Sequence, residues 1–337
     1  DSGLRVIGVD VNANVRESVN NGKCHIEEPG LAELVKEGVL SALLSAVPNP
    51  VESDVFIIAV PTPIKTDNNV KPQPDVSYVA SAVESLSEVL KADDLIIIES
   101  TSPVGTTEKM CSLLKSLRPD LFPPKGSMLF SLAFCPERIL PGKALEEMIS
   151  NDRVIGGITE KCAEDARSFY QRFVEGECSV ATSARVAELS KLAENSYRDV
   201  NIAFANELSM ICEEVGVDVW ELIELANRHP RVSVLEPGPG VGGHCIAVDP
   251  WFIVSESPSL ARLIETGRSV NDSKPTWVVE KVRRLAMENP MLPIVCCGLT
   301  FKPDVDDFRE SPSLKIYQEL DNLFPGRVIA ADPYIDK

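Results

Sequence analysis

Val55-Phe-Ile-Ile-Ala-Val60 and Leu95-Ile-Ile-Ile98 are short, continuous apolar runs rich in β-branched residues. Runs of this length are far too short to span a bilayer and are typical of strands buried on both faces. Further β-rich runs cover residues 4–10, 129–134 and 154–156, and helical patterns lie between them. This alternation predicts βαβ units and a parallel sheet covered by helices on both faces.

Polar residues follow several of these runs. Ligands of open α/β sheets bind at the carboxyl ends of the strands. The predicted ends carry Asp10, the turn Pro61-Thr62-Pro63, Glu99-Ser100-Thr101 and Pro136-Glu137-Arg138. In dinucleotide-binding folds, an acid after the second strand binds the ribose hydroxyls and favours NAD over NADP. An aspartate in this place is equally often a helix cap, so both readings of Asp10 remain open.

A dinucleotide-binding fold opens with a strand, a GxGxxG turn and a helix. Neither Gly3 nor Gly8 supplies that turn, and Val6-Ile-Gly-Val-Asp10 is typical of the second strand. We therefore expect a Rossmann-like α/β domain whose first βα unit is missing. The chain stops at Lys337 inside another apparent βαβ unit, so we expect a fragment at both ends.

From about Ser183 the pattern becomes helical. Apolar residues recur at helical spacing at Val186, Leu189, Ala193, Val200, Phe204, Leu208 and Ile211. Thirty residues of helix would be about 45 Å long, which is typical of a spine that joins domains and of a dimer surface. More helix is predicted to Asn227 and, after a glycine-rich loop, to about Glu288. Strands at 293–297 and 327–331 then predict the start of a second Rossmann-like domain. We expect three domains, at 1–181, 182–275 and 276–337.

Composition excludes several classes of function. The 337 residues carry a net charge of −18, which argues against nucleic acid or an anionic membrane as a partner. With 44% hydrophobic and 25% charged residues, the chain is typical of a soluble globular protein, and its odd number of scattered cysteines indicates the reducing cytoplasm. Nine cysteines without CxxC spacing and only three histidines disfavour a disulfide framework and a zinc site.

A glycine-rich loop precedes one of these cysteines. Pro237-Gly-Pro-Gly-Val-Gly-Gly-His-Cys245 has four glycines in six residues. Glycine allows positive φ and close approach of the backbone to a ligand, so the loop indicates a thiol presented as a nucleophile. The alternative is a glycine-proline turn that ends in a small buried residue.

Lys191 and Asn195 are four residues apart on the predicted long helix, so their side chains share one face. Beside a thiol, this ammonium and amide would stabilise an oxyanion, and the cation would lower the pKa of the thiol. Asp249, four residues after Cys245, would orient water or the lysine. The plainer readings are a solvated lysine and a turn-forming aspartate before Pro250.

Several long motifs, in order, resemble the UDP-glucose/GDP-mannose dehydrogenase family. The motifs are Leu225-Ala-Asn-Arg-His-Pro-Arg231, Pro237 to Phe252, Arg268-Ser-Val-Asn-Asp272 and Lys302 to Pro312. The resemblance runs from Val6 to Tyr334. It implies oxidation of a nucleotide-sugar C6 alcohol to a carboxylate with two NAD, a UDP-sugar substrate, and 1–181, 182–275 and 276–337 as NAD-binding, central and UDP-binding domains.

The same resemblance implies roles for individual residues. Cys245 would capture the intermediate aldehyde as a thiohemiacetal and then carry a thioester, which splits one hard step into two. Lys191 would move the proton and contact the oxyanion with Asn195, Asp249 would assist, and Glu137 would activate water. The resemblance assigns contacts with the nucleotide sugar to Arg138, Ile139, Lys191, Asn195, Arg198, His229, Arg231, Gly242, Phe301 and Lys302. Contacts to NAD fall to Asp10, Thr62, Thr101 and Arg309.

One departure separates subfamilies. UDP-glucose members typically carry a lysine directly before the loop aspartate, whereas this chain has Val248-Asp249 and His244 before the cysteine. That pattern resembles members that oxidise N-acetylated sugars, and the run 227–231 favours UDP-N-acetylmannosamine over UDP-N-acetylglucosamine. His229 and Arg231 have a plainer reading as the end of a helix.

Two further alternatives remain. A two-electron hydroxyacid or sugar-phosphate dehydrogenase would need the Lys191 and Asn195 pair but no cysteine. An inactive fragment would serve only as a dimeric module for assembly or ligand binding, since without the glycine turn the pyrophosphate loses its main site. For the active protein we expect a homodimer or higher homo-oligomer through the helix at 182–212.

Overall fold

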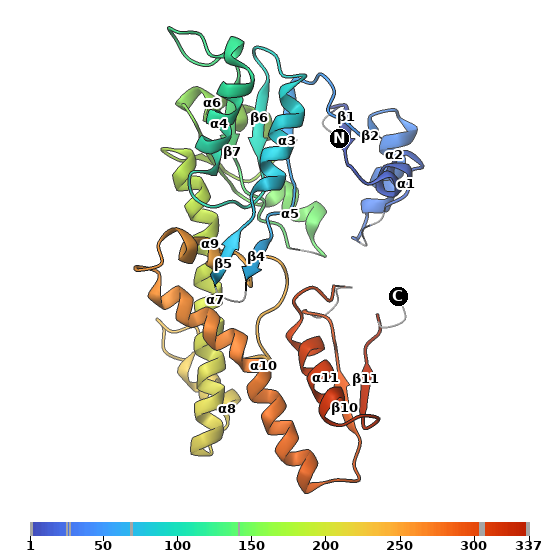
Figure 1. Ribbon diagram of the computed structural model, residues 1–337, viewed down its shortest axis with the longest axis vertical. Helices are drawn as coiled ribbons and strands as arrows, with labels where there is room; N and C mark the ends of the chain where they lie inside the picture. Colours follow the sequence, from blue (N-terminus) through green and yellow to red (C-terminus); the bar gives the residue numbers. More distant parts are fainter. Residues whose placement is uncertain are drawn as a thin grey trace. The chain divides into compact units, whose positions relative to one another are not determined.

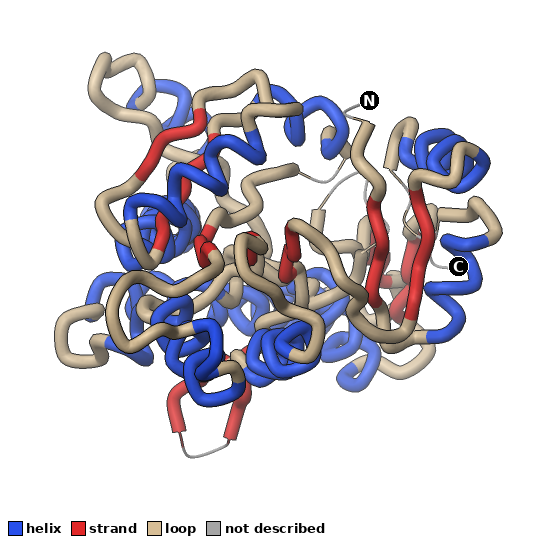
Figure 2. The backbone as a smooth tube through the Cα atoms, turned by 90° about the horizontal axis from the view of Figure 1, so that it is seen from above, coloured by secondary structure: helices blue, strands red, loops and turns tan. Residues whose placement is uncertain are grey.

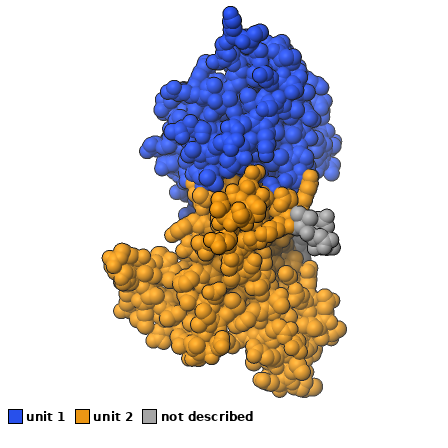
Figure 3. Space-filling view, turned by 60° about the vertical axis from the view of Figure 1, so that its left-hand side comes forward, with its two compact units in different colours: residues 1–63, 74–191 blue, residues 64–73, 192–337 orange. Residues whose placement is uncertain are grey.

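The computed structural model has two compact units, coloured separately in Figure 3. It describes residues 3–24, 26, 28–67, 70–140, 142–302 and 307–334. Unit 1 comprises residues 1–63 and 74–191, and unit 2 comprises residues 64–73 and 192–337. The centre of the Lys302 to Pro312 motif lies outside the described residues.

The larger sheet of unit 1 has the strand order β3-β6-β7-β8-β9. Its strands are β3 (Val55–Ile58), β6 (Leu95–Ile98), β7 (Ser131–Phe134), β8 (Arg153–Gly157) and β9 (Cys178–Val180). β3, β6 and β7 run parallel, and every residue of β6 and β7 is buried. The apolar runs therefore predicted the central strands correctly.

Helices cover both faces of this sheet, as expected. Ile96 and Ile98 of β6 face a core formed with α3 (Ser77–Ser87) and α4 (Thr106–Leu117). Ile97 points to the opposite face and packs with α6 (Glu160–Tyr170). Successive residues of a strand point to opposite faces, so one continuous apolar run fills two cores. Figure 1 shows α3 and α6 on either side of β6 and β7.

The expectation of an all-parallel sheet is wrong at one place, because β8 pairs antiparallel with β7. A parallel neighbour requires a crossover that packs on the sheet. Among its described residues, the connection between these two strands has one helix, α5 (Ala144–Ser150), which has no buried residue and so does not cover a face. β8 therefore runs back against β7, and β9 pairs parallel with β8.

The first two strands form a separate ladder. β1 (Val6–Val9) pairs parallel with β2 (Leu44–Val47), and α1 (Ala13–Asn20) and α2 (Leu31–Leu40) lie between them in sequence. No described strand joins this ladder to β3. Val6 is 53% exposed and Ile57 of β3 is 45% exposed. Unit 1 therefore has two sheets among its described residues.

A hairpin leaves unit 1 after Pro63 and belongs to unit 2. Its strands β4 (Ile64–Asp67) and β5 (Val70–Pro74) lie side by side in Figure 2. Lys71 Nζ lies 2.5 Å from Glu265 Oε1. The hairpin is thus joined by an ion pair to the helix α10 (Arg262–Glu288) of the same unit.

Long helices dominate unit 2. They are α7 (Ala184–Val215), whose last 24 residues lie in this unit, α8 (Val219–Ala226), α9 (Asp249–Glu256) and α10 (Arg262–Glu288). The sequence predicted α7 and the end of α10 correctly. Among the described helices, none is long and apolar enough to cross a membrane.

A small βαβ element completes the described part of unit 2. β10 (Ile294–Cys297) and β11 (Val328–Ala331) pair in parallel, and α11 (Pro312–Leu323) connects them. Ile316 and Leu320 of α11 share a small core with Val279 of α10. The predicted second βαβ unit is therefore confirmed.

Candidate active site

The glycine loop, residues 237–244, owes its shape to glycines at particular places. Gly240 and Gly243 have φ of 141° and 81°, values that residues with a side chain rarely adopt. A methyl group added at Gly242 would lie 2.6 Å from the carbonyl oxygen of Glu310 and 2.8 Å from Cβ of Phe301. The absence of a side chain at Gly242 is therefore required by packing within unit 2.

Cys245 follows this loop and is half-buried. Its carbonyl oxygen accepts hydrogen bonds from the N–H groups of Val248, at 3.0 Å, and Asp249, at 2.8 Å. These bonds form the turn that begins α9. The thiol thus lies where a tight loop meets a helix, in a setting that fixes its backbone on both sides.

Asp249 is the first residue of α9 and is 3% exposed. Its Oδ2 accepts a 2.6 Å hydrogen bond from Nδ2 of Asn195, which is 6% exposed on α7. Buried carboxylates and amides need such partners. The structure therefore brings together Asn195 and Asp249, two residues that the sequence had proposed separately.

Arg309 lies near the thiol in unit 2. Its guanidinium donates to both carboxylate oxygens of Asp307, with Nε to Oδ1 at 2.9 Å and Nη2 to Oδ2 at 2.7 Å. This pairing with Asp307 raises the pKa of Arg309, and the thiol of Cys245 raises it further. The sequence suggested an NAD contact for Arg309 but did not foresee that its charge acts on Cys245.

His244 is the residue before the nucleophile candidate. Desolvation and the nearby Arg309 guanidinium lower the pKa of His244, while Asp307 acts in the opposite direction. The net shift favours the neutral imidazole at pH 7. His244 therefore adds a hydrogen-bonding group beside Cys245 rather than a second positive charge.

Glu137 and Lys191 lie within electrostatic reach of each other in unit 1. Burial raises the pKa of Glu137, and the ammonium of Lys191 partly offsets that rise. Lys191 is 8% exposed, so it is not the solvated charge of the plainer reading. The N–H of Ile139 donates to Oε1 of Glu137. A carboxylate with a raised pKa is suited to accept a proton near neutral pH.

A second titratable cluster in unit 1 contains Glu99, Tyr170 and Arg153, and the charges of Glu99 and Arg153 act on Glu137. Tyr170 donates a 2.5 Å hydrogen bond from its hydroxyl to Oε1 of Glu99, and the Arg153 guanidinium lies 5.4 Å from the Tyr170 ring centroid. Burial raises the pKa of Glu99 and raises that of Cys135 to about 12. Cys135 is therefore an inert thiol. No sequence pattern pointed to Tyr170 or Arg153.

Three of the proposed NAD contacts lie in unit 1. Asp10 follows β1, and its Oδ1 accepts a 2.7 Å hydrogen bond from Asn12 N–H, which orients the carboxylate. Asn12, not Asp10, caps α1. Thr62 donates a 2.7 Å hydrogen bond to the carbonyl oxygen of Thr101, which joins the carboxyl ends of β3 and β6. A carboxylate and hydroxyls at strand ends fit a dinucleotide.

The N-terminus of α4 does not add an anion site. Its Gly105 and Thr107 N–H groups donate to the Glu188 carboxylate at 2.5 and 2.8 Å. Helix N-termini attract negative charge, and here a protein carboxylate supplies it. Asp10, Thr62 and Thr101 therefore stay the predicted NAD contacts of unit 1.

The remaining proposed sugar contacts are distributed over both units. Arg138 donates to the Asp152 carbonyl oxygen at 3.3 Å in unit 1. The N–H of Arg231 donates to Nδ1 of His229 at 3.3 Å, beyond the end of α8. Arg198, His229 and Arg231 are exposed, whereas Phe301 and Lys302 are half-buried. Among the described residues, no three His, Cys, Asp or Glu side chains could hold a metal together.

Comparison with known proteins identifies the family. Models of the NAD binding, central and UDP binding domains of the UDP-glucose/GDP-mannose dehydrogenase family match residues 1–174, 185–273 and 295–337. The chain belongs to the UDP-glucose/GDP-mannose dehydrogenase family. It therefore contains an NAD-binding domain and part of a UDP-binding domain, and it has the α/β fold of a dehydrogenase of this family.

Similar members of this family include several with N-acetylated substrates in their names. UDP-N-acetyl-D-mannosamine dehydrogenase of Yersinia pestis is 53% identical over 99% of this chain and 81% of its own. NDP-N-acetyl-D-galactosaminuronic acid dehydrogenase of Ralstonia nicotianae is 52% identical over 98% of this chain and 78% of its own.

Solved structures give the same result. The UDP-D-ManNAc dehydrogenase of Pyrococcus horikoshii matches with a TM-score of 0.91 at 38% identity, covering 99% of this chain and 79% of that one. The UDP-N-acetyl-mannosamine dehydrogenase of Staphylococcus aureus matches with a TM-score of 0.87 at 45% identity, covering 99% and 78%.

Proposed function

We propose that this protein oxidises the C6 alcohol of UDP-N-acetyl-D-mannosamine to UDP-N-acetyl-D-mannosaminuronate, with two NAD per sugar. The observation that carries the proposal is Cys245, half-buried between the glycine loop and α9, with the buried Asn195 and Asp249 pair beside its turn. The relatives named for the same substrate support it at 52 to 53% identity.

The first oxidation removes a hydride and a proton from the C6 alcohol. NAD, when bound, accepts a hydride from C6 in each of the two oxidations. Lys191 first releases a proton to water and then, as the neutral amine, takes the hydroxyl proton on Nζ from its buried position. Asn195 and Lys191 then donate to the developing carbonyl oxygen. The product of this step is an aldehyde.

Cys245 makes the second oxidation feasible. Its Sγ forms a bond to the aldehyde carbon, and the oxygen takes a proton, which gives a thiohemiacetal. Loss of a second hydride and one proton gives a thioester on the same sulfur. Covalent addition is needed because the aldehyde carbon cannot release a hydride until a nucleophile has added to its carbonyl group. The guanidinium of Arg309, which is paired with Asp307, also interacts with Cys245.

Water completes the reaction. Glu137 takes a proton from water as the oxygen attacks the thioester carbon, the C–S bond breaks, and Cys245 leaves as the thiolate. Overall, one alcohol, two NAD+ and one water give one carboxylate, two NADH and three protons. The exposed cations Arg198 and Arg231 would bind the nucleotide sugar together with Arg138 and His229, and Phe301 and Lys302 would bind its UDP part.

Counting NADH in a substrate panel tests this proposal. The full-length protein is incubated with UDP-N-acetylmannosamine, UDP-N-acetylglucosamine, UDP-N-acetylgalactosamine and UDP-glucose in parallel. Two NADH with the mannosamine substrate alone are expected. Preference for the galactosamine sugar would follow the equally similar Ralstonia relative, and preference for the glucosamine sugar would support the alternative epimer. A single NADH per sugar would show that only one oxidation takes place, and it would contradict the thioester step.

Glu137→Gln is expected to slow the hydrolysis of the thioester by about 100-fold, because the amide cannot accept a proton from water. Both hydride transfers still occur in this variant. A burst of NADH should therefore precede a slow steady state, and intact-mass spectra should show the acyl group on the protein. In the wild type, hydrolysis should increase as pH rises through the raised pKa of Glu137, since only the carboxylate acts as a base. Glu146→Gln, on the exposed face of α5, is the control. A linear time course without acyl-enzyme would contradict the role.

We further propose a homodimer formed through α7. Four apolar side chains of its unit 2 portion remain exposed, namely Tyr197 (71%), Phe204 (54%), Ile211 (46%) and Val215 (64%). Tyr197, Phe204 and Ile211 recur every seven residues, which is the spacing of a helix seam that meets another helix. All nine cysteines are free, which fits a cytoplasmic enzyme.

Phe204→Glu is expected to dissociate this dimer, because a two-fold seam would bring two carboxylates together in an apolar interface. Light scattering behind a sizing column should show a mass that falls from about two chains to one at micromolar concentration. Met291→Glu, which replaces a side chain that is 91% exposed outside α7, should leave the mass unchanged. An unaltered mass for the Phe204 variant would place the interface elsewhere.

A further inference from the structure

The motif Arg268-Ser-Val-Asn-Asp272 has no part in the chemistry proposed above, yet it is central to unit 2. Arg268 and Asn271 are each 1% exposed on α10. Arg268 Nη1 lies 2.5 Å from Asp199 Oδ1 on α7, and Asn271 Nδ2 donates to the same oxygen at 2.8 Å. A buried polar network therefore joins the two long helices.

Asn206 extends this network from α7 to the glycine loop. It is fully buried, and its Nδ2 donates a 2.8 Å hydrogen bond to Oδ1 of Asn271. Its Oδ1 accepts a 2.8 Å hydrogen bond from the N–H of Gly238. Since Asn271 already donates to Asp199, the amide of Asn206 can be turned only one way, with its oxygen toward the loop.

Two asparagines of α7 thus hold the two ends of the segment that contains Cys245. Asn195 binds Asp249, and Asn206 binds Gly238. The asparagines are eleven residues apart, which is about three turns and about 16 Å on one face of a helix. The loop partners are also eleven residues apart and would span about 36 Å if extended. The segment must therefore fold back between its anchors, and the glycines with positive φ allow this.

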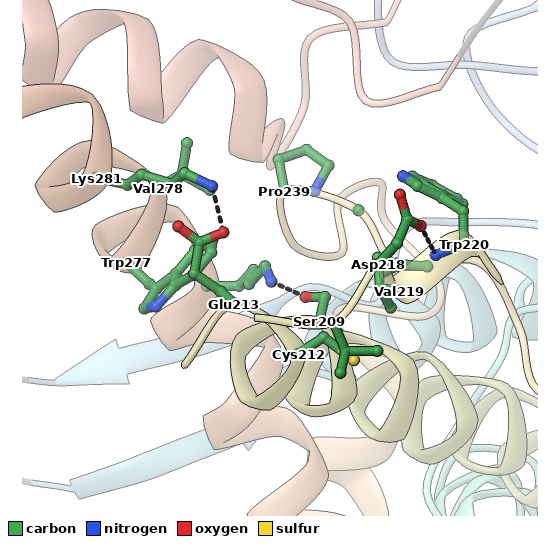
Figure 4. A pocket seen from close by; sticks show the side chains of 14 residues that line it. Ser209, Cys212, Glu213, Asp218, Val219, Trp220, Pro239, Trp277, Val278 and Lys281 are labelled. Carbon is green, nitrogen blue, oxygen red and sulfur yellow. Dashed lines mark hydrogen bonds and ion pairs between the residues drawn. The ribbon is translucent and has the colours of Figure 1, made fainter. Parts of the chain in front are cut away.

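Packing fixes the middle of the segment but leaves its first part less constrained. A methyl group at Gly240 would lie 3.0 Å from Cβ of Pro312 and 3.2 Å from the carbonyl oxygen of Asn271. By contrast, residues 237–239 line a pocket of about 430 Å³ with Trp220, Glu213 and Trp277 (Figure 4). At Gly238 an added methyl group would meet only the Gly240 carbonyl oxygen, at 3.8 Å, so the hydrogen bond to Asn206 is the contact that holds this part of the loop.

Lys274 lines the same pocket and holds Asn206 in place. Its Nζ donates to the carbonyl oxygen of Asn206 at 3.2 Å and to Oγ of Ser209, and it lies 4.3 Å from the Trp277 ring centroid. Burial lowers the pKa of Lys274 to about 8. The backbone and the side chain of Asn206 are thus both held, so its oxygen is a rigid acceptor for the loop.

We propose that Asn206 is a positioning residue for the nucleophile: through Gly238 and against Asn271, it sets the conformation of the loop that presents Cys245. The proposal deepens the function proposed above and rests on it only for the effect on turnover. The effect on the Cys245 thiol itself needs neither substrate nor NAD.

Thiol alkylation tests the proposal directly. The rate of iodoacetamide labelling of Cys245 is measured by peptide mass spectrometry, with the exposed Cys297 as the internal reference and the buried Cys212 as the reporter of unfolding. In Asn206→Leu, the loop loses its acceptor, and Cys245 should label about tenfold faster relative to Cys297 while Cys212 stays protected. Asn201→Leu, on the same helix where the asparagine bonds only its own helix, should label like the wild type.

Turnover provides the second measurement. Asn206→Leu should lower kcat about tenfold or more with KM for the nucleotide sugar changed less than about threefold, because the misplaced group acts in the covalent steps. Asn206→Asp keeps an acceptor for Gly238 N–H near the Lys274 ammonium and should recover most of the loss. A fall in kcat without any change in Cys245 labelling would overturn the proposal, as would equal labelling of Cys212 and Cys245.

Two substitutions at Gly238 test the proposal if the Asn206→Leu variant does not fold. Gly238 has no positive φ, and a methyl group there would meet only the Gly240 carbonyl oxygen, at 3.8 Å. Gly238→Ala keeps the N–H donor and should label Cys245 like the wild type, whereas Gly238→Pro removes the donor and should label it faster. Equal rates in the two variants would overturn the proposal. If the labelling predictions hold and no nucleotide sugar is oxidised, the proposed function fails and the positioning role stands.

Discussion

Cys245→Ser is expected to abolish formation of the uronate, with the rate of the second oxidation falling by at least about 10³-fold. A serine hydroxyl has a far higher pKa than a thiol and is a poor nucleophile without a dedicated base. The variant should therefore release at most one NADH per sugar, together with some free aldehyde that hydrazine traps.

Cys297→Ser is the matched control, because Cys297 is an exposed free thiol in the same unit. It should yield two NADH per sugar at the wild-type rate. Two NADH per sugar from Cys245→Ser would exclude a covalent sulfur intermediate and would leave a hydrated aldehyde as the species that is oxidised second. In that case the constrained glycine loop would have no role in presenting a nucleophile.

Local patterns predicted the elements that carry this chemistry. The fully apolar run of β6 gave a buried strand, helical spacing gave α7, and the glycines before Cys245 gave a constrained loop. Each of these depends on neighbouring residues, since burial and helical periodicity are visible within one turn or one strand. The positive φ of Gly240 and Gly243 is the conformation that the glycines had suggested.

Contacts between distant segments could not be predicted in the same way. The antiparallel pairing of β8 depends on how a short connection returns to the sheet, and the hairpin 64–74 contains Lys and Pro rather than a strand pattern. The bond from Asn206 to Gly238 joins residues 32 apart. Polar residues on one face of α7 were the only sign of this contact in the sequence, and they do not identify a partner.

Arg268→Leu is expected to destabilise the protein by about 3 to 5 kcal/mol, because it leaves the carboxylate of Asp199 buried without its cation. Asp199 is fully buried, and burial already raises its pKa even with Arg268 present. Urea unfolding followed by tryptophan fluorescence measures the change. Arg283→Leu, which removes an exposed pair with Glu280, should cost less than about 1 kcal/mol.

The pH dependence and a double variant show whether the unpaired charge is the cause. Without Arg268, the pKa of Asp199 in the folded state rises further above its unfolded value, so the folded state binds the extra proton. Stability of Arg268→Leu should therefore fall, relative to the wild type, as pH rises between those two pKa values, and it should be closest to the wild type at the acid end. Asp199→Asn combined with Arg268→Met removes both charges and keeps an acceptor for Asn271, so it should recover most of the lost stability. A double variant as unstable as Arg268→Leu would show that the guanidinium acts through its packing, and that the network holds α7 and α10 together by shape rather than by charge.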